Sequence, residues 1–93
     1  MSTVAKHLII HGRVQGVSYR AWMVGAAQAR NVSGWVRNIH DGTVEAVVSG
    51  DEADLQDLIN SCYDGPAMAD VTGIDISDAE LPASDGFEQK PSL

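Results

Sequence analysis

The residues best suited to chemistry lie in Gly12–Arg20, which reads GRVQGVSYR. Gly16 permits backbone dihedrals that turn consecutive N–H groups toward one point. The residues that follow have helical spacing, so the stretch leads into a helix N-terminus with its free N–H donors and positive dipole end. Arg20 adds a planar fork of donors suited to a phosphoryl group. The stretch could be an anion cradle or an ordinary strand-to-helix turn, and the loop alone does not decide between them.

The common nucleotide-binding loops do not fit this stretch. A Walker loop has four residues between its glycines and then Lys and Ser or Thr, whereas three residues separate Gly12 from Gly16 and no lysine follows. The G-x-G-x-x-G spacing of a dinucleotide site is also absent. The pattern therefore excludes both of these motifs while leaving a simpler phosphate site open.

The elements that must position the loop follow from the spacing of the apolar residues. Helical spacing predicts one helix over residues 19–30 and a second that begins at Asp51 and ends at Gly65-Pro66. Alternation predicts strands over residues 4–11, 34–40, 43–48 and 71–76, and a short last strand over 87–90. Pro91 confines that last strand to an edge of the sheet, because proline cannot donate to a strand ladder.

Several single residues mark the boundaries of these elements. Asn31 stands where a helix end needs a left-handed residue, and Asp51 is suited to cap the second helix. Asp41-Gly42 predicts a two-residue hairpin with a type I′ turn. The apolar residues of 71–76 fall on both parities, which indicates a bulge near Gly73 or a late strand start.

The predicted order is β-α-β-β-α-β with a terminal strand, which is the ferredoxin-like α+β arrangement. It places two helices on one face of an antiparallel sheet and a short C-terminal strand at an edge. The 93 residues, 44% of them hydrophobic, fit a single domain over 1–93 with one modest core. This fold hosts many unrelated activities, so function must come from a site.

The charge is unevenly distributed. Residues 1–50 hold five basic and two acidic residues, whereas residues 51–93 hold eleven acidic residues and one lysine. An anionic ligand therefore finds its counter-charge in the first half of the chain. The net charge of −7 argues against nucleic-acid partners, since those select basic surfaces. An RNA-binding module of this fold would also need aromatic residues on its middle strands, and 43–48 has none.

Location and assembly are expected to be simple. The N-terminal residues lack the apolar region of a signal peptide, and no stretch approaches membrane-spanning length. The single cysteine, Cys62, is compatible with a reducing compartment, and its place on the apolar stripe of the second helix favours a buried, unreactive thiol. We expect a soluble cytoplasmic monomer that contacts no membrane.

Two blocks carry a resemblance to a known family. GRVQGVSYR is followed 14 residues later by GWVRN at Gly34–Asn38, and then by DGTVEA at Asp41–Ala46. In this order and spacing the blocks resemble the acylphosphatase family, densely over residues 6–50 and more weakly as far as Gly86-Phe87-Glu88.

The resemblance implies an acylphosphatase that hydrolyses the carboxyl–phosphate bond of acyl phosphates to a carboxylate and inorganic phosphate. It implies that Arg20 is the phosphate-binding catalytic arginine and that Asn38 positions the attacking water. It also implies a loop whose backbone N–H groups hold the phosphoryl oxygens, formed by Gln15, Gly16, Val17, Ser18 and Tyr19. Taken alone, Asn38 could simply end a strand.

Some positions depart from the usual pattern of the family. Tyr19 stands where Phe is commoner and needs a partner for its hydroxyl. Asn31 replaces a common glycine, Pro66-Ala67 replaces a common Pro-Pro, and Asp70 stands where a basic residue is frequent. None of these departures falls on Arg20 or Asn38.

The implied reaction needs neither metal nor cofactor. The leaving carboxylate has a low pKa, so no strong general acid is required, and phosphoryl transfer depends mainly on positioning and charge stabilisation. His7 and His11 lie about 13 Å apart on one strand, too far to share a metal ion. The alternative function is a non-catalytic or regulatory anion-binding domain of the same fold.

Overall fold

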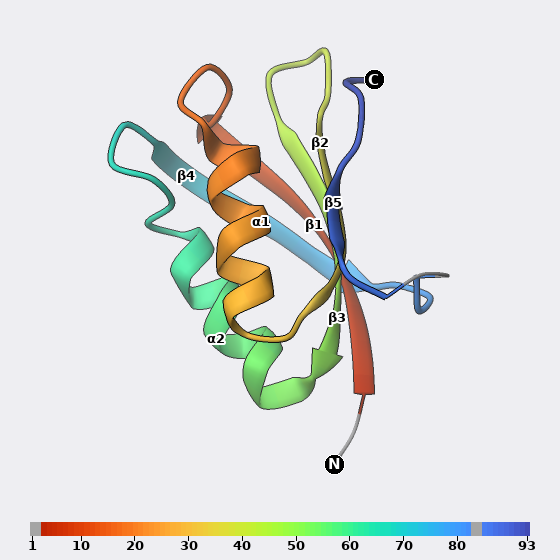
Figure 1. Ribbon diagram of the computed structural model, residues 1–93. Coiled ribbons are helices and arrows are strands. Elements are labelled where there is room, and N and C mark those ends of the chain that lie inside the picture. The colour runs from red at the N-terminus through yellow and green to blue at the C-terminus, as the bar shows by residue number, and fades with distance from the viewer. Residues whose placement is uncertain (1–2, 83–84) are drawn as a thin grey trace.

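The computed structural model describes residues 3–82 and 85–93. Within these residues, two helices and five strands follow one another in the predicted order (Figure 1). They are β1 (Thr3–Arg13), α1 (Tyr19–Ala29), β2 (Ser33–Asn38), β3 (Val44–Asp51), α2 (Glu52–Cys62), β4 (Asp70–Asp78) and β5 (Phe87–Gln89). No helix in this part of the chain is both long and apolar enough to cross a membrane.

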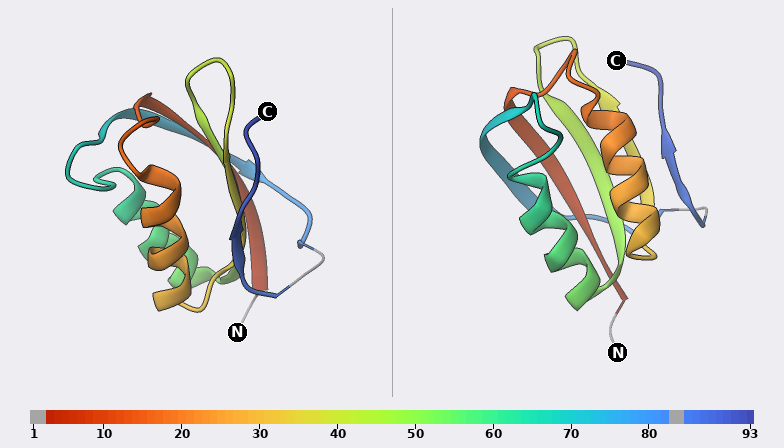
Figure 2. Two further views of the ribbon diagram at one scale, coloured as in Figure 1. Left: turned by 45° about the horizontal axis from the view of Figure 1, so that its top comes forward. Right: turned by 60° about the vertical axis from the view of Figure 1, so that its left-hand side comes forward.

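The strands form one sheet in the order β4-β1-β3-β2-β5, and both helices lie on the same side of it (Figure 2). This confirms the ferredoxin-like α+β fold. The sheet is mixed rather than wholly antiparallel, because β5 runs parallel to β2 at the edge while the other pairs are antiparallel. The predicted short edge strand is confirmed, and the structure adds that it runs parallel to its neighbour.

The hydrophobic core lies between the helices and the inner face of the sheet. The predicted apolar stripe of the second helix is buried in full, and so is the alternating face of the central strand. The buried residues of these two elements include Leu55, Leu58, Ile59 and Cys62 of α2, and Val44, Ala46 and Val48 of β3. Burial of the leucine, isoleucine and valine side chains among them stabilises the fold by about 1.5–3 kcal/mol each, relative to leaving them exposed.

The helix boundaries follow local signals in the sequence. Asn31 adopts the expected left-handed conformation, with φ of 58°. Asp51 caps α2, since its side chain accepts a hydrogen bond from the backbone N–H of Ala53. The second helix ends at Cys62, before the predicted stop at Gly65-Pro66.

The bulge predicted near Gly73 is present in β4. His11 of β1 is opposite Gly73, whereas the next residue, Gly12, is opposite Val71. Thr72 is therefore the extra residue of the bulge. It explains why Val71, before the bulge, and Ile74, after it, do not follow one alternating pattern along the strand.

The turn between β2 and β3 differs from the prediction. The backbone N–H of Gly42 donates to the oxygen of Ile39 at 3.1 Å, and Ile39 in turn donates to the oxygen of Thr43 at 2.9 Å. Gly42 has φ of 99°, but Asp41 does not have a positive φ, so the type I′ turn was wrong. The loop is one residue wider, with Gly42 in the left-handed position that follows the turn. The Asp41 carboxylate accepts hydrogen bonds from Thr43 N and Oγ1, which favours this turn.

Candidate active site

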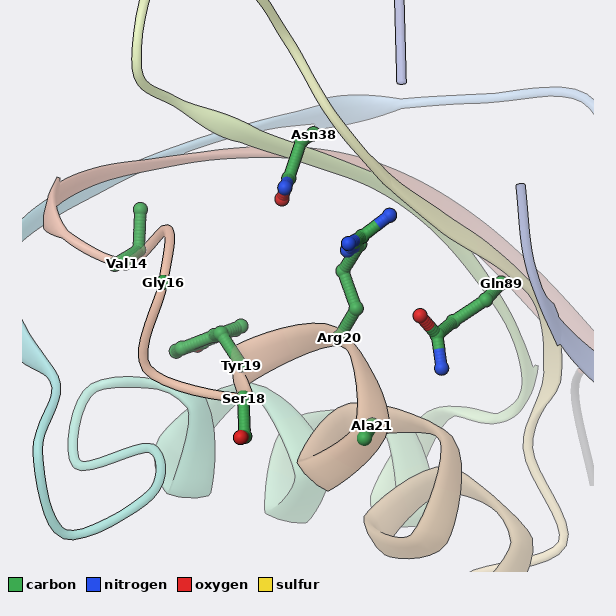
Figure 3. Close-up of a pocket in the computed structure, with 8 residues that line it drawn as sticks. All are labelled: Val14, Gly16, Ser18, Tyr19, Arg20, Ala21, Asn38 and Gln89. Atoms are coloured by element: carbon green, nitrogen blue, oxygen red, sulfur yellow. The ribbon is translucent and has the colours of Figure 1, made fainter. Parts of the chain in front are cut away.

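A pocket of about 410 Å³ lies where α1 begins, next to the end of β2 (Figure 3). It is bordered by the loop between β1 and α1, the first turn of α1, the last residue of β2, and β5. The lining residues are Val14, Gly16, Ser18, Tyr19, Arg20, Ala21, Asn38 and Gln89. The fold therefore brings Arg20 and Asn38 to one pocket from separate elements.

The loop before α1 depends on unusual backbone conformations. Gly16 has φ of 74° and Ser18 has φ of 64°, both in the left-handed region. A left-handed residue other than glycine costs roughly 1–2 kcal/mol. Ser18 is the N-cap of α1 but makes no side-chain cap hydrogen bond. The first helical bond runs from Trp22 N to Ser18 O at 3.0 Å, so the N–H groups before it have no acceptor within the helix.

The start of this loop is fixed by a close backbone approach. Gly12 has φ of 118°, and a Cβ added there would lie 2.1 Å from the backbone oxygen of Asp70. Only glycine fits at this position. Asp70 begins β4 opposite Arg13 and does not line the pocket. The acidic residue at this position, where a basic one is commoner, therefore does not change the pocket lining.

Two of the predicted loop residues support the loop rather than line the pocket. Gln15 Nε2 donates to the backbone oxygens of Ile39 at 2.6 Å and Thr43 at 2.9 Å, which joins the loop to the β2–β3 hairpin. Val17 is buried and forms part of the hydrophobic core. Gly16, Ser18 and Tyr19 do line the pocket.

Tyr19 anchors the start of α1 to the end of α2. Its side chain is buried, and its hydroxyl donates to the backbone oxygen of Cys62 at 2.6 Å. Burial, with a smaller contribution from Cys62, raises the pKa of this hydroxyl far above its ordinary value. The ring also packs against Trp22 at 5.3 Å between centroids. Tyrosine in place of the commoner phenylalanine is therefore satisfied by a hydrogen bond.

Arg20 projects from the first turn of α1 into the space between Asn38 and Gln89 (Figure 3). The side chains of Arg30 and Arg37 form ion pairs with Asp57 and Glu45. Within residues 3–82 and 85–93, by contrast, no carboxylate lies within ion-pair distance of Arg20. Its positive charge is therefore available to an anion that enters the pocket.

Asn38 is the last residue of β2, and its side chain points toward the pocket (Figure 3). Its backbone oxygen accepts a hydrogen bond from Leu93 N at 2.9 Å. Its side-chain Oδ1 is buried and has no hydrogen-bond partner in the described part of the chain. Leaving such an acceptor unpaired costs roughly 1–3 kcal/mol. A bound water or ligand donor would remove this penalty.

A family model described as Acylphosphatase matches residues 6–89. The chain belongs to the acylphosphatase family. An acylphosphatase from Acidiphilium cryptum is 51% identical over 94% of this chain and 96% of that relative. The crystal structure of an acylphosphatase from Bacillus subtilis has a TM-score of 0.90, with 32% identity over 94% of this chain and 98% of the other. The expected family and enzyme class are thereby confirmed.

A longer protein also resembles this acylphosphatase-family chain. The structure of full-length HypF in its phosphate- and nucleotide-bound form matches with a TM-score of 0.90 and 27% identity. The match covers 98% of this chain but 12% of HypF. The same fold is therefore found both in short acylphosphatases and within a much larger chain.

Three residues of this acylphosphatase-family pocket were not predicted from the sequence: Val14, Ala21 and Gln89. Val14 is buried at the start of the loop, and Ala21 is a small, exposed residue on the first turn of α1. Gln89 comes from β5, and only the parallel pairing with β2 brings it to the pocket. Its parity with the buried Phe87 was the available signal, since alternate residues of a strand face the same side.

Two of the three histidines pair with separate carboxylates. His7 Nε2 lies 2.7 Å from Glu45 Oε2, and His11 Nε2 lies 2.8 Å from Asp75 Oδ2. Among the residues that the structure describes, no group of three His, Cys, Asp or Glu side chains is placed to hold a metal ion. Cys62 is buried, and burial raises the pKa of its thiol to about 11, which makes it unreactive at neutral pH.

Proposed function

We propose that this protein hydrolyses the carboxyl–phosphate bond of small acyl phosphates, giving a carboxylate and inorganic phosphate. One observation carries the proposal. Arg20 and Asn38 face the same pocket at the N-terminus of α1. Among the described residues, Arg20 has no ion-pair partner and the buried side-chain oxygen of Asn38 has no hydrogen-bond partner. Family membership supplies the reaction class, and the pocket supplies residues suited to it.

In this proposal the phosphoryl group is held by the loop and Arg20. The backbone N–H groups of Gln15–Tyr19 and the helix N-terminus offer donors to its oxygens. The Arg20 guanidinium offers parallel donors and a positive charge. Phosphoryl transfer spreads negative charge over the three equatorial oxygens, and fixed donors there stabilise the transition state more than the ground state.

Asn38 Oδ1 accepts a hydrogen bond from the attacking water and directs its oxygen toward phosphorus. The water oxygen forms the new P–O bond, and the bond from phosphorus to the carboxyl oxygen breaks. The electron pair of that bond leaves with the carboxylate, and both water protons end on the phosphate. Because a carboxylate is a good leaving group, this scheme requires no general acid, metal or cofactor.

Phosphate release from acetyl phosphate in excess chelator tests the proposal. We expect turnover by the wild-type protein that chelator does not reduce. Failure to turn over acetyl phosphate, benzoyl phosphate and other small acyl phosphates would contradict it.

We expect the protein to act as a monomer in the cytoplasm on these small molecules.

The alternative is a non-catalytic or regulatory domain that binds an anion in the same cradle. The likeness to part of HypF, solved in a phosphate- and nucleotide-bound form, is the observation that favours it. Such a domain would bind inorganic phosphate without turning over any acyl phosphate. The same assay, together with calorimetric titration of phosphate, therefore separates the two functions.

A further inference from the structure

Gln89 lines the pocket from β5, a strand to which the proposed reaction assigns no role. It is the last residue of β5, opposite Val36 of the parallel strand β2. Phe87, two residues earlier, is buried in the core on the helix side. Alternate residues of a strand share a face, so Gln89 also points to that side, where it borders the pocket next to Arg20 (Figure 3).

The position of Gln89 is fixed by its neighbours. Phe87 anchors one end of β5 in the core. At the other end, the backbone N–H of Lys90 donates to the oxygen of Val36 at 2.8 Å, and the Lys90 ammonium lies over the Trp35 ring at 4.8 Å. The backbone is therefore held on both sides of Gln89, which suits a residue that must orient a ligand.

The Gln89 carboxamide is uncommitted. Within the described ranges it makes no hydrogen bond to the protein, like the exposed Gln28 and unlike Gln15 and Gln56. Of the two unbonded glutamines, only Gln89 borders the pocket. It offers two N–H donors and an acceptor oxygen to whatever occupies the pocket. In Figure 3 it lies on the side of Arg20 away from the loop that carries Gly16.

The proposed reaction leaves one part of the substrate without a protein contact. The loop and Arg20 take the phosphoryl oxygens, and Asn38 takes the water. The acyl group remains, with a carbonyl oxygen that gains negative charge as the carboxylate leaves. A pocket of about 410 Å³ falls within the usual range for small-molecule sites, so it has room for more than a phosphoryl group.

We propose that Gln89 contacts the acyl part of the substrate, donating a hydrogen bond from Nε2 to its carbonyl oxygen. This inference rests on the proposed acyl-phosphate hydrolysis. The hydrogen bond strengthens as the P–O bond breaks, because the acceptor changes from a neutral carbonyl to a carboxylate. An interaction that is stronger in the transition state than in the ground state raises the rate of reaction.

Gln89→Met tests this contact, because methionine keeps the length of the side chain and removes its donors. The matched control is Glu88→Gln on the same strand, where the exposed side chain faces the other way. We expect Gln89→Met to lower kcat/KM for acetyl phosphate about 10- to 100-fold, as for loss of a hydrogen bond to a charged group. We expect Glu88→Gln to leave it within about twofold.

Inorganic phosphate separates a contact with the acyl group from a general disturbance of the site. The competitive inhibition constant for phosphate should be the same in the wild type and in Gln89→Met, because phosphate has no acyl group. The kcat/KM values for acetyl phosphate and benzoyl phosphate should both fall in Gln89→Met, because both substrates carry the carbonyl oxygen, and neither should fall in Glu88→Gln. The inference would be overturned if Gln89→Met left kcat/KM unchanged for both substrates, or if it weakened phosphate binding as much as it lowered kcat/KM. Either result would leave the proposed function intact. Absence of wild-type turnover would overturn both.

Discussion

Arg20 and Arg37 are both half-buried arginines, yet they have opposite surroundings. Arg37 lies on the sheet face away from the helices, where its Nε donates to Glu45 Oε1 at 2.6 Å and its guanidinium lies 4.8 Å from the centre of the Trp35 ring. Arg20 lies in the pocket on the helix side, and no described carboxylate pairs with it. The first charge is neutralised within the fold, whereas the second is left for a ligand.

The Glu45 cluster shows what a structural use of charge requires. Glu45 Oε1 accepts a hydrogen bond from Arg37 Nε, and Glu45 Oε2 lies 2.7 Å from His7 Nε2. Burial alone would raise its pKa, but the hydrogen bonds from His7 and Arg37 outweigh burial and lower it. Each of the three charged or titratable side chains in this cluster therefore has a partner. In the pocket, by contrast, the charge of Arg20 and the side-chain acceptor of Asn38 have no partner among residues 3–82 and 85–93, which is the pattern expected of a binding site.

Replacement of Arg20 should have the largest effect. We expect Arg20→Gln to lower kcat/KM for acetyl phosphate roughly 10²- to 10³-fold, since one preorganised donor at a reacting group contributes about this much. Phosphate affinity, measured by calorimetry, should fall as well, because the charge that holds the anion is lost.

The matched control is Arg37→Gln, which makes the same arginine-to-glutamine substitution on the other face of the sheet. It should leave kcat/KM within about twofold but lower the free energy of unfolding, since it breaks a half-buried ion pair. If Arg37→Gln reduced activity as much as Arg20→Gln, the contrast between the two arginines would be wrong.

Replacement of Asn38 should separate binding from turnover. We expect Asn38→Ala to lower kcat roughly 10²- to 10³-fold while phosphate affinity stays near that of the wild type. The free energy of unfolding should not fall, because the variant removes a buried acceptor that has no partner in the described chain. A large loss of stability, measured by urea unfolding, would show that Asn38 is mainly structural.

The Gln15 side chain should have a smaller effect, mostly on stability. Gln15→Leu removes the two hydrogen bonds to the hairpin at Ile39 and Thr43. We expect a loss of about 1–3 kcal/mol in the free energy of unfolding. The exposed Gln28 of α1 provides a matched control, and Gln28→Leu should change stability by less than about 0.5 kcal/mol. Equal effects of the two variants would show that the Gln15 contacts do not support the loop.

The smallest effect concerns the Glu45 cluster and pH. A carboxyl group whose pKa is lowered by folding stabilises the protein above its ordinary value of 4.5 and loses this contribution as pH falls through the lowered value. Urea unfolding between pH 7 and pH 3 should therefore show a steeper loss of stability in the wild type than in Glu45→Gln. Parallel curves for the two proteins would contradict the assigned ion pair.

Local signals predicted much of the fold. Asn31 and Asp51 marked helix boundaries correctly, because their effect depends on neighbouring backbone groups alone. The site pair Arg20 and Asn38 came from the order of two sequence blocks, and the fold does bring both residues to one pocket. Gln89 was missed because its place depends on how β5 pairs with β2, which is a contact between distant parts of the chain.

The hairpin shows where a local signal competed with a longer pattern. A two-residue turn at Asp41-Gly42 would place Asn38 opposite Glu45, whereas the observed register places Arg37 opposite Glu45 and Asn38 opposite Val44. A shift of one residue turns every side chain of a strand to the other face. The alternation of β2 and β3 already favoured the wider turn, because Val36 and Ala46 must both face the core.

The C-terminal segment has a practical consequence for measuring ligand binding. Leu93 donates its N–H to Asn38 and accepts from the N–H of His40 at 2.8 Å, so residue 93 is joined to the strand end that carries Asn38. Thr3 begins β1 at the opposite end of the molecule (Figure 1). A fluorescent dye attached at residue 93 would therefore sense occupancy of the pocket, while attachment to a sensor surface through the N-terminal side would leave the pocket open to solution.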